Sequence, residues 1–355
     1  MNSRFRRIVR WTFKLGLWFV CGLAGLLLAG TIWQHWAAKK DATRFPPPGR
    51  MIDLGGRRLF LACGGSGSPT VVFDSGLGDD HTSWLKVYPE VAKFTRACVY
   101  DRAGMGWSDP GPLPRDSAHI VSDLHDVLAK AGEAGPFVLA GHSIAGCHIR
   151  VYAQRYRSEV AGLVLVDPTP AGAFADPGPS FAPIISTIPK LGGAVTRIAE
   201  FLSVTGVLRA IGSMQGEKGL APQFRSADET TKHVAVYGPP TRQFRAIRDE
   251  EDSITDDARQ AAAVKNLGDL PLTLLEARKP LTDSSATPLL GFFLPRGYDV
   301  HSGLLALQTA AYADHAGQAA LSTRGRLVRA EKSDHYVQLD QPDLVISTIG
   351  RICGR

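Results

Sequence analysis

FVLAGHSIAG, residues 137–146, changes its periodicity half-way along. Its first part is a short apolar run of the kind that forms a strand buried on both faces of a sheet. After a turn at Gly141-His142-Ser143, residues 144–156 place apolar side chains at helical spacing. A serine at a sharp bend between a buried strand and a helix is typical of a nucleophile elbow. Such a bend needs small residues on both sides, and Gly141 and Ala145 supply them, although the usual pattern has Gly where Ala145 stands.

The same residues also fit an ordinary glycine-containing turn in which Ser143 begins a helix. Short patterns of this kind are common by chance, so the interpretation depends on the order of the elements around the stretch.

Strands and helices alternate on both sides of this stretch, which predicts a mostly parallel sheet with right-handed crossovers. A β-hairpin is expected first, and a helix that begins at Pro342 is expected to close the fold. The expected hairpin covers 51–63, the expected strands are 70–74, 97–100, 137–140, 162–167, 272–276 and 325–330, and the expected helices include 84–94, 120–131 and 342–352.

The alternation stops for about a hundred residues after the strand at 162–167. Residues 170–268 are rich in Pro, Gly and Ala, contain irregular amphipathic pieces and show no convincing strand. We therefore predict a helical cap over 170–268, inserted into an α/β core made of residues 51–169 and 269–355.

The N-terminal region has the properties of a membrane anchor. Residues 15–38 carry no charge and are long enough to cross a bilayer. We predict a basic cytoplasmic tail at 1–14, a transmembrane signal anchor at 15–38 and a Pro-rich linker at 39–50. A cleaved signal peptide is the alternative, but the apolar run is too long for one and lacks a small-x-small cleavage site.

The net charge of +6 comes from this region, because residues 1–44 contain eight basic residues and one acid. The remaining body is close to neutral, so the charge indicates membrane topology and predicts no nucleic-acid partner. A single-pass protein with its basic tail in the cytoplasm has its body in the periplasm or outside the cell. Lys39 and Lys40 on the far side reduce the charge asymmetry on which this orientation depends.

The five cysteines show no Cys/His spacing that resembles a zinc site. Cys63 and Cys98 fall on strands expected to be neighbours, where a disulfide is geometrically feasible. We expect buried free thiols at both positions.

Several motifs together resemble capped bacterial hydrolases of the α/β-hydrolase superfamily, over nearly all of the chain after residue 50. They are Ser75-Gly-Leu-Gly78, the loop from Tyr100 to Pro112, Gly141 to Gly146, and His335 followed by Pro342. The resemblance implies a mostly parallel hydrolase sheet flanked by helices. It also implies that Ser143 is the nucleophile, that His335 is the base, and that backbone N–H groups of Leu77 and Ile144 form the oxyanion hole. Many relatives have His where this chain has Ser75, a change that leaves the backbone donor in place.

The acid that orients the histidine is expected at the end of a strand beside the elbow. Many members of the superfamily carry it after the strand that follows the cap, where this chain offers Glu276 and Asp283 without the usual Gly-x-x-Asp turn. Other members place it one strand earlier, where Asp167 stands. We predict Asp167, with Asp283 and then Glu276 as alternatives; the simpler interpretation of Asp167 is a turn residue before Pro168.

A serine nucleophile favours acyl transfer to water over the reactions of haloalkane dehalogenases and epoxide hydrolases, which need a carboxylate nucleophile. We therefore expect a serine hydrolase that cleaves a small-molecule ester-like substrate, with no metal and no organic cofactor; the sequence makes no prediction of the oligomeric state. One alternative is a proline-releasing aminopeptidase, in which acidic residues among Asp249 to Asp252 would bind the substrate amine, although a solvated charged run explains them more simply. The other is a non-catalytic, hydrolase-like binding protein of the cell envelope.

Overall fold

The computed structural model describes residues 3–220, 224, 227–283 and 293–355. The chain divides into two compact units, residues 1–46 with 198–241, and residues 47–197 with 242–355. The second unit contains the whole sheet and every residue that the sequence analysis assigns to the site.

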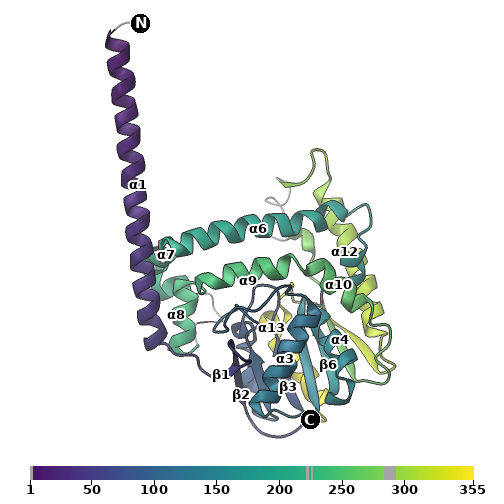
Figure 1. Ribbon diagram of the computed structural model, residues 1–355. Coiled ribbons are helices and arrows are strands. Elements are labelled where there is room, and N and C mark those ends of the chain that lie inside the picture. The colour runs from purple at the N-terminus through teal and green to yellow at the C-terminus, as the bar shows by residue number, and fades with distance from the viewer. Residues whose placement is uncertain (1–2, 221–223, 225–226, 284–292) are drawn as a thin grey trace. The chain divides into compact units, whose positions relative to one another are not determined.

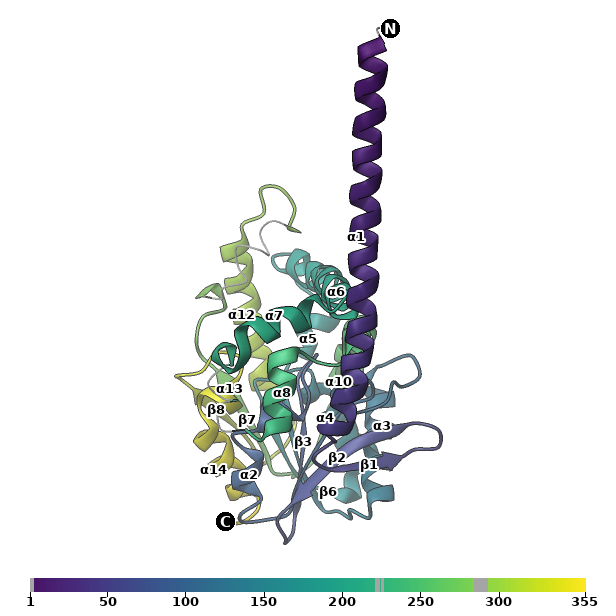
Figure 2. The same ribbon diagram turned by 90° about the vertical axis from the view of Figure 1, so that its left-hand side faces the viewer.

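The described residues form one eight-stranded sheet in the order β1-β2-β4-β3-β5-β6-β7-β8. β1 pairs antiparallel with β2 and β2 antiparallel with β4, whereas every other pair is parallel. Figure 2 shows β1 and β2 at one edge and β8 at the other. The strands are β1 (Arg50–Asp53), β2 (Arg58–Gly64), β3 (Thr70–Asp74), β4 (Ala97–Tyr100), β5 (Phe137–His142), β6 (Val160–Val166), β7 (Leu272–Ala277) and β8 (Gly325–Ala330).

The central strands are buried on both faces, as their uninterrupted apolar runs predict. Alternate side chains enter two different clusters: Leu139 faces α3 (Ser117–Ala131) and α4 (Ala145–Arg155), whereas Val138 faces α2 (Tyr88–Val91) and α14 (Pro342–Ile352). Figure 1 shows the resulting three layers, with the sheet between helices.

Between β6 and β7 the described chain contains helices and no strand, as the sequence predicts for the inserted segment. A further helix, α12 (Val300–Ala319), lies between β7 and β8, where the sequence analysis makes no prediction; Asp299 caps it by accepting from the Ser302 N–H. The inserted helices are α5 (Ala171–Ala175), α6 (Ala182–Val204), α7 (Val207–Gln215), α8 (Glu229–Tyr237), α9 (Thr241–Glu251) and α10 (Ile254–Ala262). Shorter pieces are η1 (His81–Trp84), η2 (Arg157–Glu159), η3 (Gly216–Gly219), η5 (Leu281–Asp283) and α13 (Val337–Asp340).

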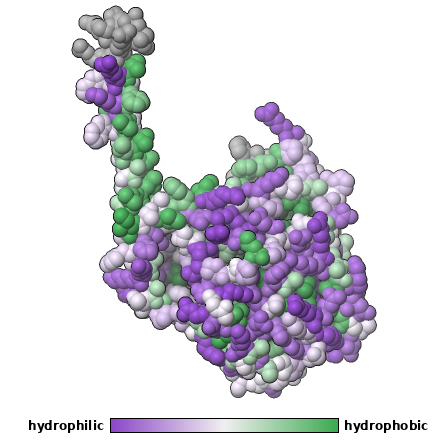
Figure 3. Space-filling view, in the orientation of Figure 1, coloured by the Kyte–Doolittle hydropathy of each residue, from purple (hydrophilic) through white to green (hydrophobic). Residues whose placement is uncertain are grey.

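The N-terminal helix α1 (Ser3–Arg44) is longer than the expected anchor at 15–38. It continues through residues expected to be linker because nothing breaks a helix before Pro46, which disfavours helical geometry at Phe45. Among the described residues, α1 is the single straight helix that is long and apolar enough to cross a membrane. Apolar side chains are exposed along it, as Figure 3 shows. The prediction of a mostly parallel α/β sheet, an inserted helical segment and a long apolar N-terminal helix is confirmed.

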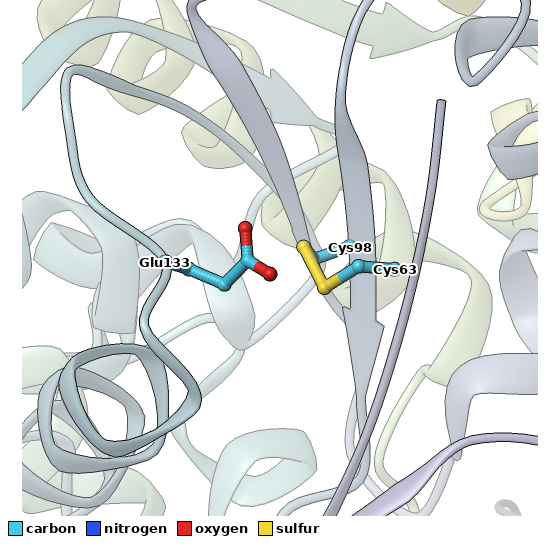
Figure 4. A group of neighbouring side chains, drawn as sticks. All are labelled: Cys63, Cys98 and Glu133. Atoms are coloured by element: carbon cyan, nitrogen blue, oxygen red, sulfur yellow. A yellow bond between two sulfur atoms is a disulfide. The ribbon is translucent and has the colours of Figure 1, made fainter. Parts of the chain in front are cut away.

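Cys63 and Cys98 form a disulfide between β2 and β4, where they stand directly opposite each other (Figure 4). The expectation of buried free thiols is therefore wrong at these two positions. The sequence placed the cysteines on neighbouring strands correctly, but the register of the antiparallel pair, which decides whether two side chains meet, cannot be obtained from composition.

Candidate active site

Ser143 occupies the bend between β5 and α4 with a φ of 56°, in the left-handed region that a residue with a β-carbon rarely adopts. Its N–H donates to the Val166 carbonyl, which fixes the bend against β6. A β-carbon at Gly141 would lie 2.8 Å from the Ala145 carbonyl oxygen, and one at Gly146 would lie 2.5 Å from Cβ of Pro168. The bend therefore needs glycine at both 141 and 146, and the second glycine stands one position after Ala145, which carries a methyl group.

The structure brings Ser143, His335 and Asp167 into one hydrogen-bonded line. Nε2 of His335 lies 2.9 Å from Oγ of Ser143, and its Nδ1 lies 2.7 Å from Oδ2 of Asp167. The serine comes from the end of β5, the aspartate from the end of β6 and the histidine from the loop after β8. This is the geometry in which an imidazole accepts a proton from a hydroxyl while a carboxylate fixes its orientation.

Asp167 also has a left-handed backbone, with φ of 41°. Its N–H donates to the Leu275 carbonyl, and its Oδ1 accepts a hydrogen bond from the Ala277 N–H at 2.9 Å. With Oδ1 engaged by β7, Oδ2 is directed at His335. The strained turn therefore aims one particular carboxylate oxygen at the imidazole.

The charges of this pair support each other. Burial favours the neutral carboxyl of Asp167, but the hydrogen bond and the charge of His335 outweigh it and lower the pKa of Asp167. Burial likewise opposes protonation of His335, yet the hydrogen bond to Asp167 and the nearby carboxylates raise the pKa of His335. The imidazolium that forms when the histidine takes a proton is thus stabilised by the aspartate.

The alternative acids are placed differently. Glu276 is buried at the end of β7, where it pairs with His315 at 3.3 Å and with Arg278 at 3.1 Å. The side chain of Asp283 lies outside the part of the chain that the structure describes. Of the two acids whose side chains are described, Asp167 is the one hydrogen-bonded to His335.

Helix α12 holds the turn that carries Asp167, a contribution that the sequence analysis missed. Nε2 of His315 lies 2.8 Å from the Pro168 carbonyl oxygen, and Nε2 of Gln318 donates to the Thr169 carbonyl. Burial opposes protonation of His315, but its hydrogen bond to Glu276 prevails and raises the pKa of His315. A buried histidine between a carbonyl and an acid could have been suspected only if α12 had been placed from the sequence.

A buried arginine holds the turn that carries the expected oxyanion donor. Arg102 donates to the carbonyl oxygens of Ser75 and Gly76, the two residues immediately before Leu77. It also binds Asp74 at 2.9 Å and, through two nitrogens at 2.8 Å, both carboxylate oxygens of Glu250 on α9. Arg102 therefore ties two parts of the fold together: the turn at residues 75–77 (the oxyanion turn) and α9 of the inserted segment.

The acidic run at 249–252 is only partly solvated. Glu250 is 3% exposed and is occupied by Arg102, and Glu251 is also buried. Nearby, Gln243 of α9 donates to the Gly78 carbonyl, which adds a second tie between this helix and the oxyanion turn. Glu250 is therefore a structural counter-ion and is not available to bind a substrate amine.

His142, the residue before Ser143, packs against His335. Its Nε2 lies 2.8 Å from the backbone oxygen of His335 and, since that atom only accepts, the ring donates. Burial lowers the pKa of His142 to about 3, so the ring is neutral. Through this hydrogen bond, His142 supports the loop that carries His335.

A cavity of about 740 Å³ opens beside Ser143. Leu77 and Ile144, the expected oxyanion residues, line it next to the serine, and His335 lines it too. Most of the remaining wall is apolar, including Phe174, Ile188, Ile254, Leu281, Leu307 and Ala311. A cavity of this size and lining suits a small or medium molecule with a substantial apolar part.

Two groups of described side chains have ligand-type atoms close enough to share a metal ion. In one, the sulfur atoms of Cys63 and Cys98 are bonded to each other, and Glu133 binds Arg96, so no thiolate is present to act as a ligand (Figure 4). In the other, His81 and Asp101 hydrogen-bond to each other, and Asp80 caps η1. A disulfide and an ion pair account for the first group, and internal hydrogen bonds account for the second.

Comparison with known proteins agrees with this geometry. Residues 71–348 match the alpha/beta hydrolase family, and the chain belongs to that family. The uncharacterized Bacillus subtilis protein YbdG is 30% identical over 138 residues, which cover 38% of this chain and 42% of that protein. The matched stretch thus spans less than half the length of that relative.

Solved structures with the same fold include enzymes of different chemistry. An esterase from Thermogutta terrifontis has a TM-score of 0.53 at 18% identity and covers 85% of this chain and 96% of its own. An epoxide hydrolase from Bacillus megaterium has a TM-score of 0.58 at 14% identity, with 86% and 100% covered. At such identities the likeness defines the fold, and the reaction has to be argued from the site.

Proposed function

We propose that this chain is a serine hydrolase that cleaves a carboxylic ester through an acyl-enzyme on Ser143. The observation that carries the proposal is the hydrogen-bonded line from Ser143 through His335 to Asp167 at the mouth of a largely apolar cavity. A hydroxyl at this position is what separates ester chemistry from the epoxide hydrolases of the fold, which use a carboxylate nucleophile.

In the first half of the reaction, Oγ of Ser143 attacks the ester carbonyl carbon and its proton passes to Nε2 of His335. The negative charge on the carbonyl oxygen is stabilised by the N–H groups of Leu77 and Ile144. Collapse of this intermediate breaks the bond to the alcohol oxygen, which leaves with the proton from His335. In the second half, water gives a proton to His335, attacks the acyl carbon and releases the acid, and Ser143 regains its proton.

Asp167 holds the imidazole with Nδ1 protonated and Nε2 free to accept, and it stabilises the imidazolium formed in both halves. Arg102 acts one step away from the reacting atoms, because its hydrogen bonds to the carbonyls of Ser75 and Gly76 fix the turn that presents the Leu77 N–H.

Labelling with a fluorophosphonate tests the nucleophile. The folded wild-type chain should be modified at Ser143, and the Ser143→Ala variant should be unmodified and inactive on p-nitrophenyl esters. Modification at a different residue would refute the proposal. So would failure of a folded wild-type protein to react with a range of fluorophosphonates and esters, which would favour a binding protein.

We also propose that α1 anchors the protein in a membrane as a single pass, with the basic tail in the cytoplasm and the hydrolase outside it. The uncharged run at 15–38 and the basic residues before it support this orientation. The disulfide between Cys63 and Cys98 fits an oxidising compartment. Protease added to spheroplasts, from which any outer membrane has been removed, should digest the body, and the chain should stay with the membrane after an alkaline wash. A body that stays protected in spheroplasts would reverse the orientation.

A further inference from the structure

Within the unit formed by residues 1–46 and 198–241, the second half of α1 packs against the turn that joins α6 and α7. The backbone oxygen of Thr205 lies so close to Gly30 that a β-carbon there would clash, and a β-carbon at Gly206 would lie 3.0 Å from Cε3 of Trp33. Further along, Arg209 of α7 donates to Gln34 at 2.7 Å. Asp41 binds the same Arg209 at 2.7 Å. These contacts fix the level along α1 at which the α6–α7 turn sits.

That level coincides with the end of the expected membrane span. A hydrocarbon core of about 30 Å needs about 20 helical residues at 1.5 Å each. Counted from Lys14, the last charged residue before the apolar run, a span of this length ends near residue 34. Gly30 and Trp33 therefore belong to the last turn or so of the span, and Trp33 and Trp36 have the positions of interfacial anchors. The α6–α7 turn, held against Gly30 and Trp33, lies at the same depth.

The helices on either side of this turn expose large apolar side chains. On α6, Ile198, Phe201 and Val204 recur every three residues, and on α7, Ile211 and Met214 are three residues apart, so each set lies on one face of its helix. All five are exposed, and Met214 is 87% exposed. Figure 3 shows apolar side chains along α1 and on the end of α6 next to it. α6 and α7 together also satisfy the length and composition of a membrane segment, bent by 78° between them.

We infer that the end of α6 and α7 form a membrane-docking surface, made of Ile198, Phe201, Val204, Ile211 and Met214, that inserts into the interfacial region of the bilayer beside α1. Large apolar side chains are unfavourable in water and are stabilised by burial among lipid headgroups and upper acyl chains. A membrane-spanning segment would need the two helices in a straight line. The bend between α6 and α7 instead allows both of them to lie along the membrane surface. The inference rests on the proposed anchor, since α1 sets the depth of the turn, and it is independent of the reaction at Ser143.

Depth-dependent fluorescence quenching tests the surface in the full-length protein. The chain, with Cys21→Ser and Cys353→Ser, is reconstituted into nanodiscs of phosphatidylcholine and phosphatidylglycerol, some carrying a nitroxide on the upper acyl chain. A bimane label is placed at Ile211→Cys or Met214→Cys. We expect blue-shifted emission and loss of most of its intensity in the nitroxide-containing discs.

Two further label positions separate the possible failures. Phe19→Cys, exposed on α1, reports whether the anchor spans the bilayer, and Glu229→Cys, at the start of α8, is a polar control that should stay unquenched. Quenching at position 19 with water-like emission at 211 and 214 would overturn the docking surface while leaving the anchor intact. Blue-shifted emission at 211 and 214 without quenching would show that a second copy of the chain or another protein covers the face, which also overturns the inference. No quenching at position 19 would refute the anchor and the docking surface together.

Discussion

Replacing Asp167 by asparagine tests which group orients His335, because the structure determines how the new side chain must turn. Oδ1 of Asp167 accepts from the Ala277 N–H, and of the two atoms of an asparagine amide only the oxygen can accept. The NH₂ group is therefore directed at Nδ1 of His335 and donates to it. The imidazole then carries its proton on Nε2, facing Ser143, and cannot accept the proton of the serine.

The expected loss is large for a change of one atom. Holding a catalytic imidazole in the wrong tautomer lowers kcat by roughly 10³- to 10⁴-fold, which corresponds to about 4 to 5.5 kcal/mol of transition-state stabilisation. KM should change little, since Asp167 lies behind His335 and since asparagine has the same shape as aspartate. Loss of the carboxylate also removes the hydrogen bond and the charge of Asp167, which contribute most to raising the pKa of His335, so the residual activity should extend to lower pH.

The assay is steady-state hydrolysis of a p-nitrophenyl ester by the wild type, Asp167→Asn and Glu276→Gln. Glu276→Gln is the matched control: it removes a carboxylate at the end of the neighbouring strand, which pairs with His315 and Arg278. Thermal unfolding of each variant shows whether a loss of rate reflects loss of folded protein. If Asp167→Asn stays within about tenfold of the wild type, or if folded Glu276→Gln loses as much activity as Asp167→Asn is expected to lose, the assignment of the acid is wrong.

Three further outcomes follow from the geometry. His335 must be neutral to act as the base, and its pKa is raised, so kcat/KM should increase with pH through a midpoint above the ordinary histidine value of about 6.5. A midpoint below that value would contradict the geometry. Glu250→Gln weakens the hydrogen bonds with Arg102 that hold the oxyanion turn. The value of kcat and the affinity for a boronic-acid mimic of the intermediate should therefore both fall roughly tenfold or more, while KM is nearly unchanged. An equal loss of affinity for a substrate-like inhibitor would indicate general disorder of the site. Gly146→Ala, whose β-carbon would lie 2.5 Å from Cβ of Pro168, should lower the free energy of unfolding by about 1 to 3 kcal/mol, whereas Gly317→Ala, in open space on α12, should raise it by up to about 1 kcal/mol; chemical denaturation of both variants checks the contrast.

The sequence predicts the core of this fold well because its buried strands are continuous apolar runs and its turn residues are distinctive. The run at 70–74 coincides with β3, the run at 137–140 lies within β5, and Ser143 stands at the bend where the pattern changes period. The order of these elements along the chain is enough to indicate the sheet, because parallel strands joined by helices have few ways to connect.

The site was harder to predict where it depends on side-chain direction. Asp167 and Glu276 end adjacent parallel strands, so sequence position alone left both open as the partner of His335. What separates them is the left-handed φ of Asp167 and its hydrogen bond to Ala277, and neither has a sequence signature. The pairing of Cys63 with Cys98 was missed for a similar reason, since register and not proximity decides it.

The inserted segment was the least readable part of the chain, because its helices are held by contacts with distant residues. Glu250 looks like one acid in a charged run until Arg102, from a loop that precedes it by more than a hundred residues, is seen to bind it. Such long-range ion pairs leave no local periodicity for a sequence analysis to detect.

The ion pair between Arg102 and Glu250 also limits how a larger molecule can enter the cavity beside Ser143. Swinging α9 outward would break both hydrogen bonds between Arg102 and Glu250 and leave the buried carboxylate of Glu250 without its counter-ion, so this helix is best regarded as a fixed part of the fold. None of the described residues of α9 lines the cavity, whereas α5 and α12 contribute Phe174, Leu307 and Ala311 to its wall. Laboratory evolution toward bulkier esters should therefore accumulate changes in that wall and leave α9 untouched.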